Sequence, residues 1–295
     1  MSKINIQFTL FSAFYSPLIS TMTGGFLKDE GLDYEWSVAE PGVTAITALD
    51  NGSADVVQST LSQGFNTLNK GETPTCVHFA QINEMDGFFI TGRDAEPDFS
   101  WHKLEGAKVL VHHGGQPMTM FKYACYKAGI DINKINIIDA GSGGEMDAAF
   151  RAGTGQYIHQ QGPAPQQLAA DGVGHVVAQL GPVIGACGFS SLAANPAWLA
   201  TDEAKAFTRA YIKTRNYMND TSAAEIASAQ KPLFPKIDEA VLADCVGTYQ
   251  AMGCWTRHID ITQDGYDAML DIFEYDGKLP QRYDYDQVCA QPPAV

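Results

Sequence analysis

Short polar runs follow several segments that are typical of β-strands, and their residue types suit the binding of a polar ligand. Hydroxyl and amide side chains donate and accept hydrogen bonds, and glycine lets a ligand approach the backbone. Backbone amides at the start of the next helix attract carboxylate, sulfonate or phosphate groups. The candidate ligand-binding residues are Ser12, Tyr15, Gly42, Thr44, Ser59, Thr60, His112, His113, Gly114, Gly115, Gln116, Gln160 and Gln161.

Two of these runs offer more chemistry than the others. In the first, the hydroxyls of Ser12 and Tyr15 can bond a polar ligand while neighbouring aromatic faces stack on a ring. In the second, residues 112–117, a histidine can donate a hydrogen bond or carry charge. Neighbouring residues on a strand point to opposite faces, so His112 and His113 would not converge, and we expect no metal site. Each polar run could instead serve only as a helix cap.

The sequence shows no arrangement that would support covalent catalysis. Residues 141–144 are rich in glycine, but they lack the Gly-x-Gly-x-x-Gly spacing and a following Lys-Ser/Thr pair. Nucleotide binding is therefore only weakly supported. No nucleophile elbow accompanies a Ser-His-Asp order. We expect no catalytic residue and no cofactor.

The pattern of apolar and turn residues predicts two α/β units followed by a mainly helical end. Strand–helix–strand repetition is typical of an α/β domain with a largely parallel sheet. The predicted strands are 4–10, 34–39, 55–58, 76–81, 88–91, 108–112, 135–138, 156–159 and 176–180. The predicted helices are 14–31, 43–51, 61–70, 118–128, 145–152, 164–170, one that follows an N-cap at Thr201, 237–252 and 263–275.

Composition excludes some classes of partner. The chain has 295 residues, with 34 acidic and 19 basic side chains and a net charge of -15. No cluster of lysine and arginine is present, so nucleic acid is not an expected partner. No apolar run approaches the ~18 residues of a membrane-spanning helix, so we expect no membrane insertion. The six cysteines show no Cys-x-x-Cys spacing and are expected to be buried free thiols.

The N-terminus lacks the basic head, apolar middle and cleavage site of a signal peptide. As written, the chain is therefore expected to be cytoplasmic. If it is a trimmed mature form, it is expected to be periplasmic.

Four short segments, in this order along the chain, resemble the SsuA/THI5-like (NMT1) family. They are GFLKDEGLD at 25–33, TALDNGSAD at 47–55, LEGAKV at 104–109 and ANPAW at 194–198. The third resembles the start of the family's second lobe, and the fourth resembles the segment before its long helix. The resemblance spans about residues 4–220.

The resemblance implies an α/β, two-lobed type II periplasmic-binding-protein fold with two hinge crossings, near Thr91 and near 187–189. Lobe one would combine 1–91 with 189–295, and lobe two would be 92–188. The implied function is that of a solute-binding protein that holds a small organic metabolite, anionic or heteroaromatic, in the cleft between the lobes. Its partner would be an ABC permease, or it would bind its ligand in the cytoplasm.

An enzyme on the same fold stays open as the alternative. The resemblance implies that the THI5 branch makes the pyrimidine precursor of thiamin from pyridoxal phosphate. That branch carries a lysine and a histidine near the third turn, where this sequence has Ser59 and Gln63, and a cysteine-rich run where it has Cys187. A Schiff base needs a lysine amine, so this departure favours a binding protein.

Overall fold

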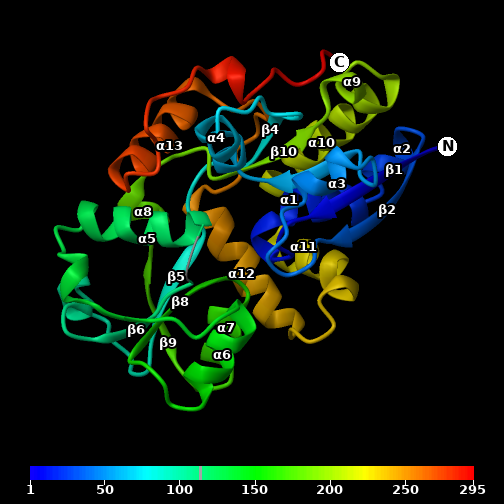
Figure 1. Cartoon of the computed structure of the whole chain (residues 1–295). Helices are drawn as coiled ribbons and strands as arrows, with labels where there is room; N and C mark the ends of the chain where they lie inside the picture. Colours follow the sequence, from blue (N-terminus) through cyan, green and yellow to red (C-terminus); the bar gives the residue numbers. More distant parts are fainter. Residues whose placement is uncertain (113–114) are drawn as a thin grey trace.

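The structure is a computed structural model that describes residues 1–112 and 115–295. Within those residues, two five-stranded sheets form the framework, and Figure 1 shows them lying apart, each with helices packed against it. The first sheet has the order β2-β1-β3-β10-β4 and the second β7-β6-β8-β5-β9. The strands of the first sheet are β1 (Ser2–Phe8), β2 (Leu32–Val38), β3 (Val56–Ser59), β4 (Val77–Asn83) and β10 (Ser190–Ala194). Those of the second are β5 (Phe88–Gly92), β6 (Lys108–Leu110), β7 (Asn136–Ile138), β8 (Tyr157–Gln161) and β9 (His175–Gln179).

Helices connect and cover the strands. Their bounds are α1 (Ser16–Thr23), α2 (Phe26–Asp29), α3 (Ile46–Asp50), α4 (Leu61–Asn69), α5 (Gly115–Lys127), α6 (Gly143–Arg151), α7 (Ala164–Ala170), α8 (Gly181–Ile184), α9 (Pro196–Leu199), α10 (Asp202–Asp220), α11 (Ala223–Gln230), α12 (Glu239–Met252) and α13 (Gln263–Tyr275). The single helix predicted over 14–31 is divided into a 3-10 helix (Ala13–Tyr15), α1 and α2. The last break falls at Gly25, whose φ of 81° is a left-handed conformation that glycine adopts without steric cost.

The chain passes between the sheets twice, once from β4 to β5 and once from β9 to β10. After the second crossing, β10 pairs antiparallel with both β3 and β4. β5 pairs antiparallel with β8 and β9, so it belongs to the second sheet. The first crossing was expected near Thr91, at the end of this strand. It lies before the strand, because the apolar run Phe88–Thr91 suits a buried strand in either sheet.

The long helix α10 forms as its sequence predicts. The hydroxyl of Thr201 caps it by accepting a hydrogen bond from Ala204 N at 3.2 Å. Acidic residues in the first turn complement the helix dipole. The stripe at spacings of three and four is buried, and it consists of Phe207, Ala210, Tyr211, Thr214 and Met218. Burial of one face is what fixes such a helix against its sheet.

Two C-terminal helices span the gap between the sheets. In Figure 1, α12 passes between the two groups of strands. It packs on α11, beside the first sheet, and on α7, beside the second. On the other side, α13 contacts α4 through the ring pair Phe65–Tyr266, with centroids 5.8 Å apart, and also packs on α5. The C-terminal third of the chain therefore holds the two sheets in their present arrangement.

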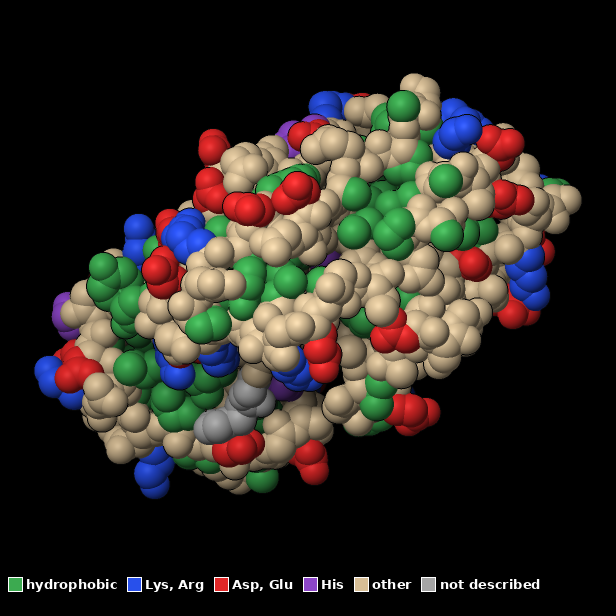
Figure 2. All heavy atoms as spheres, turned by 45° about the horizontal axis from the view of Figure 1, so that its top comes forward, with side chains coloured by type: hydrophobic (Ala, Val, Ile, Leu, Met, Phe, Trp, Pro, Cys, Tyr) green, Lys and Arg blue, Asp and Glu red, His purple; other side chains and the backbone are tan. Residues whose placement is uncertain are grey.

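The surface agrees with the composition. Figure 2 shows acidic and basic side chains scattered over one face of the molecule, without a basic patch. All six cysteines, which lie within the described ranges, are buried and free, as expected. No helix in the described part of the chain has the length and apolar character needed to span a membrane.

Candidate functional site

The end of β1 meets the end of β8 where the two sheets face each other. Ser12 Oγ accepts a hydrogen bond from Phe14 N at 3.1 Å and donates one to Gly162 O at 2.6 Å. Tyr15 lies one turn further on, and its hydroxyl is 3.5 Å from Gln161 Nε2. Burial raises the pKa of Tyr15 to about 12, so the phenol stays neutral. Two predicted ligand-binding runs, far apart in the sequence, are therefore in contact.

Gln116 joins this group from the first turn of α5. Its Nε2 donates to Phe189 O, on the second crossing, at 2.7 Å. The Phe189 ring centroid lies 5.3 Å from that of Phe14 and 6.3 Å from that of Phe88. An aromatic centre thus lies between the polar groups of the two sheets. We define the junction site as Ser12, Tyr15, Ser59, Gln116, His159 and Gln161.

Ser59 ends β3 and is paired with Ser191 of β10. Its Oγ is buried and has no hydrogen-bond partner among the described residues. Thr60, the next residue, caps α4 by accepting from Ser62 N at 3.2 Å, and its hydroxyl also bonds Ser62 Oγ. The cap role of Thr60 is therefore observed, whereas its role in ligand binding stays a prediction.

The structure places other predicted residues away from this group. Gly42 is exposed in a turn with φ of 81°. Thr44 lines a groove between α3 and α4 together with Gln63 and His78, and no junction-site residue lines that groove. Gln160 lies on the opposite face of β8 from Gln161 and reaches Asp147 of α6 at 3.4 Å. Side-chain alternation along the strand is the physical reason for this last separation.

The run that starts at His112 is only partly described. His112 follows β6 and lies near His159, and Gly115 begins α5 with φ of 58°. The predicted residues His113 and Gly114 lie outside the described residues.

His159, which the sequence analysis did not select, lies on β8 two residues before Gln161. The side chain is fully buried. Its ring stacks on Phe88 with centroids 4.5 Å apart and planes at 24°, and lies 5.1 Å from the Phe121 ring. Burial, and to a smaller extent the charge of His112, lowers the pKa of His159 to about 3, so the imidazole is neutral. The predicted strand 156–159 ends at this residue, and the sequence analysis selected the two glutamines that follow it, although the histidine type was an available signal.

Several junction atoms are buried without a hydrogen-bond partner in the part of the chain that the structure describes. They are Ser59 Oγ, Gln116 Oε1, Gln161 Oε1 and both ring nitrogens of His159. Buried polar atoms in proteins are nearly always paired, so each of these needs an explanation. Four of these atoms belong to side chains of the second sheet and its helix α5, and Ser59 ends an inner strand of the first sheet, so we infer that they are available to hydrogen-bond a ligand between the sheets.

The residues present do not fit pyridoxal phosphate. The resemblance places the lysine of the THI5 branch at Ser59, and a serine hydroxyl cannot form a Schiff base. Within the described ranges, no three histidine, cysteine, aspartate or glutamate side chains gather in a way that would hold a metal ion. The arrangement suits reversible binding through hydrogen bonds and ring contacts.

A buried carboxylate pairs with two partly exposed lysines between α5 and the end of α13. Asp276, next to the end of α13, accepts hydrogen bonds from Lys122 Nζ and Thr119 Oγ1, both at 2.7 Å, and its Oδ2 lies 3.0 Å from Lys278 Nζ. Its side chain is 3% exposed. Burial alone would raise the pKa of Asp276, but the hydrogen bonds from Lys122, Thr119 and Lys278 outweigh burial and hold the pKa below its ordinary value. This cluster ties α5 of the second sheet to α13.

We expect Asp276→Asn to lower the melting temperature at pH 7 by roughly 2–6 °C, because the charge-assisted bonds are lost. A lowered folded-state pKa stabilises the protein above the ordinary pKa of 3.8 and ceases to do so as pH falls below it. The difference in melting temperature between Asp276→Asn and the unmodified protein should therefore shrink as the pH falls below about 4. Calorimetry at several pH values measures it. Asp271→Asn, an exposed change on the same helix, is the control, and an equal effect of both changes would refute the assignment.

Two five-stranded sheets, two crossings and a polar junction between them define the class of the type II periplasmic binding proteins. The chain belongs to the NMT1/THI5 like family, whose model matches residues 14–223.

Relatives agree with this assignment. The chain is 26% identical to the protein named "Putative binding protein YtlA" of Bacillus subtilis (strain 168), over 98% of this chain and 87% of that protein. Its structure is similar to the periplasmic aliphatic sulphonate binding protein SsuA of Escherichia coli, with a TM-score of 0.75, 14% identity and coverage of 98% and 97% of the two chains. It is also similar to the periplasmic nitrate-binding protein NrtA of Synechocystis PCC 6803, with a TM-score of 0.73, 17% identity and coverage of 98% and 86%. These two likenesses show the shared fold.

Proposed function

We propose that the protein is a solute-binding protein that encloses a small organic molecule between its two sheets and passes it to an ABC permease. The observation that carries this proposal is the junction site, where Ser12 and Tyr15 contact the end of β8 and where side chains on both sides keep buried polar atoms without a hydrogen-bond partner in the described chain. Because the sheets are joined by two crossings, they can open as lobes and close again on a ligand. The lobes that we propose follow the predicted division, 1–91 with 189–295 and 92–188, with strand β5 assigned to the second lobe.

Two further observations support this function over catalysis. The relatives named above are binding proteins for sulphonate and nitrate, or are named as binding proteins without a stated ligand. The site itself offers hydroxyl, amide and aromatic groups, which bind a solute without reacting with it. For the ligand, we propose a compact metabolite with a ring or a polar headgroup, small enough to lie beside the rings of Phe14, Phe88 and Phe189.

We expect a bound solute to raise the melting temperature by roughly 5–10 °C at a hundredfold excess over its dissociation constant. The experiment is a thermal-shift screen, with mass spectrometry of whatever the denatured protein releases. Gln161→Leu should weaken the best hit about tenfold, because it removes a junction amide. Gln63→Leu changes the same residue type in the groove between α3 and α4 and is the control. The reverse ranking would place the ligand in that groove, and a screen without any hit would refute the proposed function.

A further inference from the structure

The unpartnered atoms of the junction site are mostly hydrogen-bond acceptors. Gln116 Nε2 donates to the backbone carbonyl of Phe189 at 2.7 Å. A carbonyl can only accept, so this bond fixes which end of the amide is nitrogen, and Gln116 Oε1 is left as a buried acceptor without a partner in the described chain. Gln161 Oε1 is also buried without a partner in the described chain, but its Nε2 faces the Tyr15 hydroxyl, which can donate or accept, so the amide orientation is assigned and not fixed as it is in Gln116. A ligand that satisfies these oxygens must bring N–H or O–H groups.

His159 adds one donor and one acceptor to the same face. His159 and Gln161 are two residues apart on β8 and so lie on one side of the sheet, where Phe88 is paired with Gln161. Phe121 of α5 covers that face, and Gln116 extends from the start of the same helix. A neutral imidazole carries one N–H and one bare nitrogen, whichever tautomer forms. Neither has a hydrogen-bond partner within the described residues.

The charged side chains near the junction site do not favour an anionic ligand. In the described chain, no lysine or arginine donates a hydrogen bond to a junction side chain. Lys278 Nζ approaches Gly115 O at 3.4 Å, but it is bound to Thr119 Oγ1 at 2.7 Å and pairs with Asp276. Asp86, on the first crossing, is fully buried, and its Oδ1 accepts from Phe88 N at 2.7 Å. A nitrate or sulfonate group brings only acceptors and negative charge, so it would meet unpaired oxygens here.

We propose, building on the proposed function, that the ligand is an uncharged molecule carrying N–H or O–H donors, and that His159 selects it. The imidazole receives one hydrogen bond and returns another, while the oxygens of Gln116 and Gln161 accept the remaining donors. The stacked Phe88 ring holds the imidazole plane in a fixed orientation, so the two bonds are directional. This ligand class differs from the sulphonate and nitrate bound by the similar structures named above.

Matched probes test the ligand class. Nicotinamide and nicotinate share one ring, but the first carries an uncharged amide and the second a carboxylate. Cytosine is a second uncharged probe, and nitrate and ethanesulfonate are further anions. Titration calorimetry should show binding of nicotinamide or cytosine and none of the three anions. Binding of an anion, or of no uncharged probe, would overturn the inference. Anion binding that Gln161→Leu weakens would leave the proposed function standing, whereas a protein that binds nothing at all would refute both.

Substitutions of His159 test its role in ligand binding. His159→Phe keeps the ring stack and removes both nitrogens, so affinity for the uncharged probe should fall about 10- to 100-fold. The melting temperature of the free protein should stay equal or rise, because a buried polar group without a partner is removed. His159→Gln keeps a donor and an acceptor and should recover part of the affinity. His175→Phe, on the exposed edge strand of the same sheet, should change neither quantity. Unchanged affinity in His159→Phe would refute the role of His159.

Discussion

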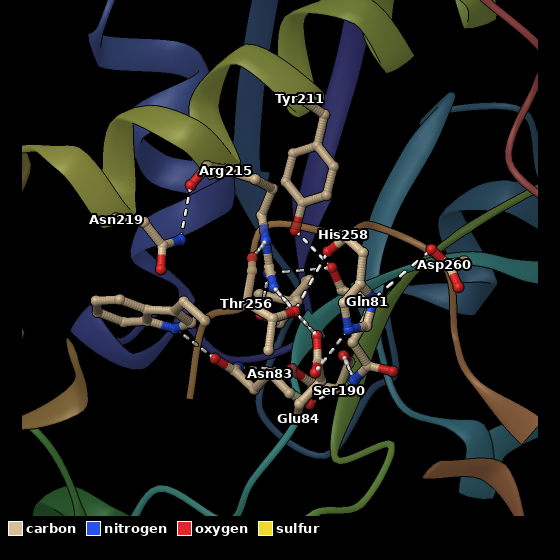
Figure 3. Close-up of polar contacts among 12 residues, drawn as sticks. Gln81, Asn83, Glu84, Ser190, Tyr211, Arg215, Asn219, Thr256, His258 and Asp260 are labelled. Carbon is tan, nitrogen blue, oxygen red and sulfur yellow. Dashed lines mark hydrogen bonds and ion pairs between the residues drawn. The ribbon is translucent and has the colours of Figure 1, made fainter. Parts of the chain in front are cut away.

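Replacing Arg215 with methionine is expected to lower the melting temperature by roughly 10 °C. Arg215 projects from α10, and its side chain is fully buried. Nη1 donates to Ile82 O and Nε to Thr256 O, both at 2.6 Å, and Nη2 lies 3.3 Å from Glu84 Oε1 (Figure 3). Removing one partner of a buried ion pair costs about 3–5 kcal/mol, because the other charge and the carbonyls lose their partners. For a chain of this size, that corresponds to roughly the stated shift.

The network around Arg215 also holds the first crossing in place. Glu84 follows β4 directly, and its second carboxylate oxygen lies 3.2 Å from His258 Nε2. Tyr211, one turn before Arg215 on α10, donates its hydroxyl to Gln81 O at 2.7 Å (Figure 3). Side chains of α10 and of residues 256–258 therefore hold the end of β4 and Glu84, the residue that follows it. We expect Arg215→Met to weaken ligand affinity as well, because the crossing sets how the two sheets meet.

A nearby arginine provides the control. Arg257 pairs with Asp220 at the surface, and its side chain is 54% exposed. Exposed ion pairs contribute little, so Arg257→Met should leave the melting temperature almost unchanged. Differential scanning calorimetry of both variants and the unmodified protein makes the comparison. Equal shifts for the two variants would show that burial of the Arg215 network is not what stabilises the crossing.

Much of the fold could be predicted from the sequence because its signals are local. Helix caps such as Thr201 and the alternation of strands with helices depend on neighbouring residues, and they placed most elements to within a few residues. The break at Gly25 was missed because the apolar pattern continues through it. The pairing of β5 was missed because strands that are buried on both faces show no alternation, so the sequence does not reveal which sheet they enter.

The candidate site was harder to predict, because it depends on contacts between distant segments. Thr44 follows β2, and β2 is the edge strand of the first sheet, so the turn after it lies away from the junction. Ser12 follows β1 and Ser59 ends β3, and both of these are inner strands. Whether a polar run lies at the junction or away from it therefore depends on the strand order. A single polar run does not reveal the order of the strands in the sheet. His159 was missed for a related reason, since its importance comes from Phe88 and Phe121 on other elements.

Replacing Asp86 with asparagine is expected to stabilise the protein at pH 8 and to have little effect near pH 4. Asp86 lies on the first crossing, and burial raises its pKa from 3.8 to about 7, against a smaller opposing effect of the bond from Phe88 N. The folded state therefore holds this proton more tightly than the unfolded state does. Its contribution to stability is complete below the ordinary pKa and is lost as pH rises through about 7. That interval corresponds to about 4 kcal/mol.

Asparagine does not ionise, and its side-chain oxygen can still accept the hydrogen bond from Phe88 N. The stability of the variant should therefore not fall between pH 4 and pH 7 because of this residue. The buried His78 and His159, whose pKa values burial lowers to about 3, also make stability depend on pH. Both proteins contain them, so their effect cancels in the difference. Urea unfolding at pH 4, 6 and 8 should show a gap that widens with pH, while the exposed change Asp98→Asn should show no such trend. A gap that stays constant would mean that the pKa of Asp86 is the same in the folded and the unfolded protein, and would refute the effect of burial. A widening gap would show that ionising Asp86 destabilises the folded protein, and a buried carboxyl group of this kind on the first crossing supports our proposal that the ligand is uncharged.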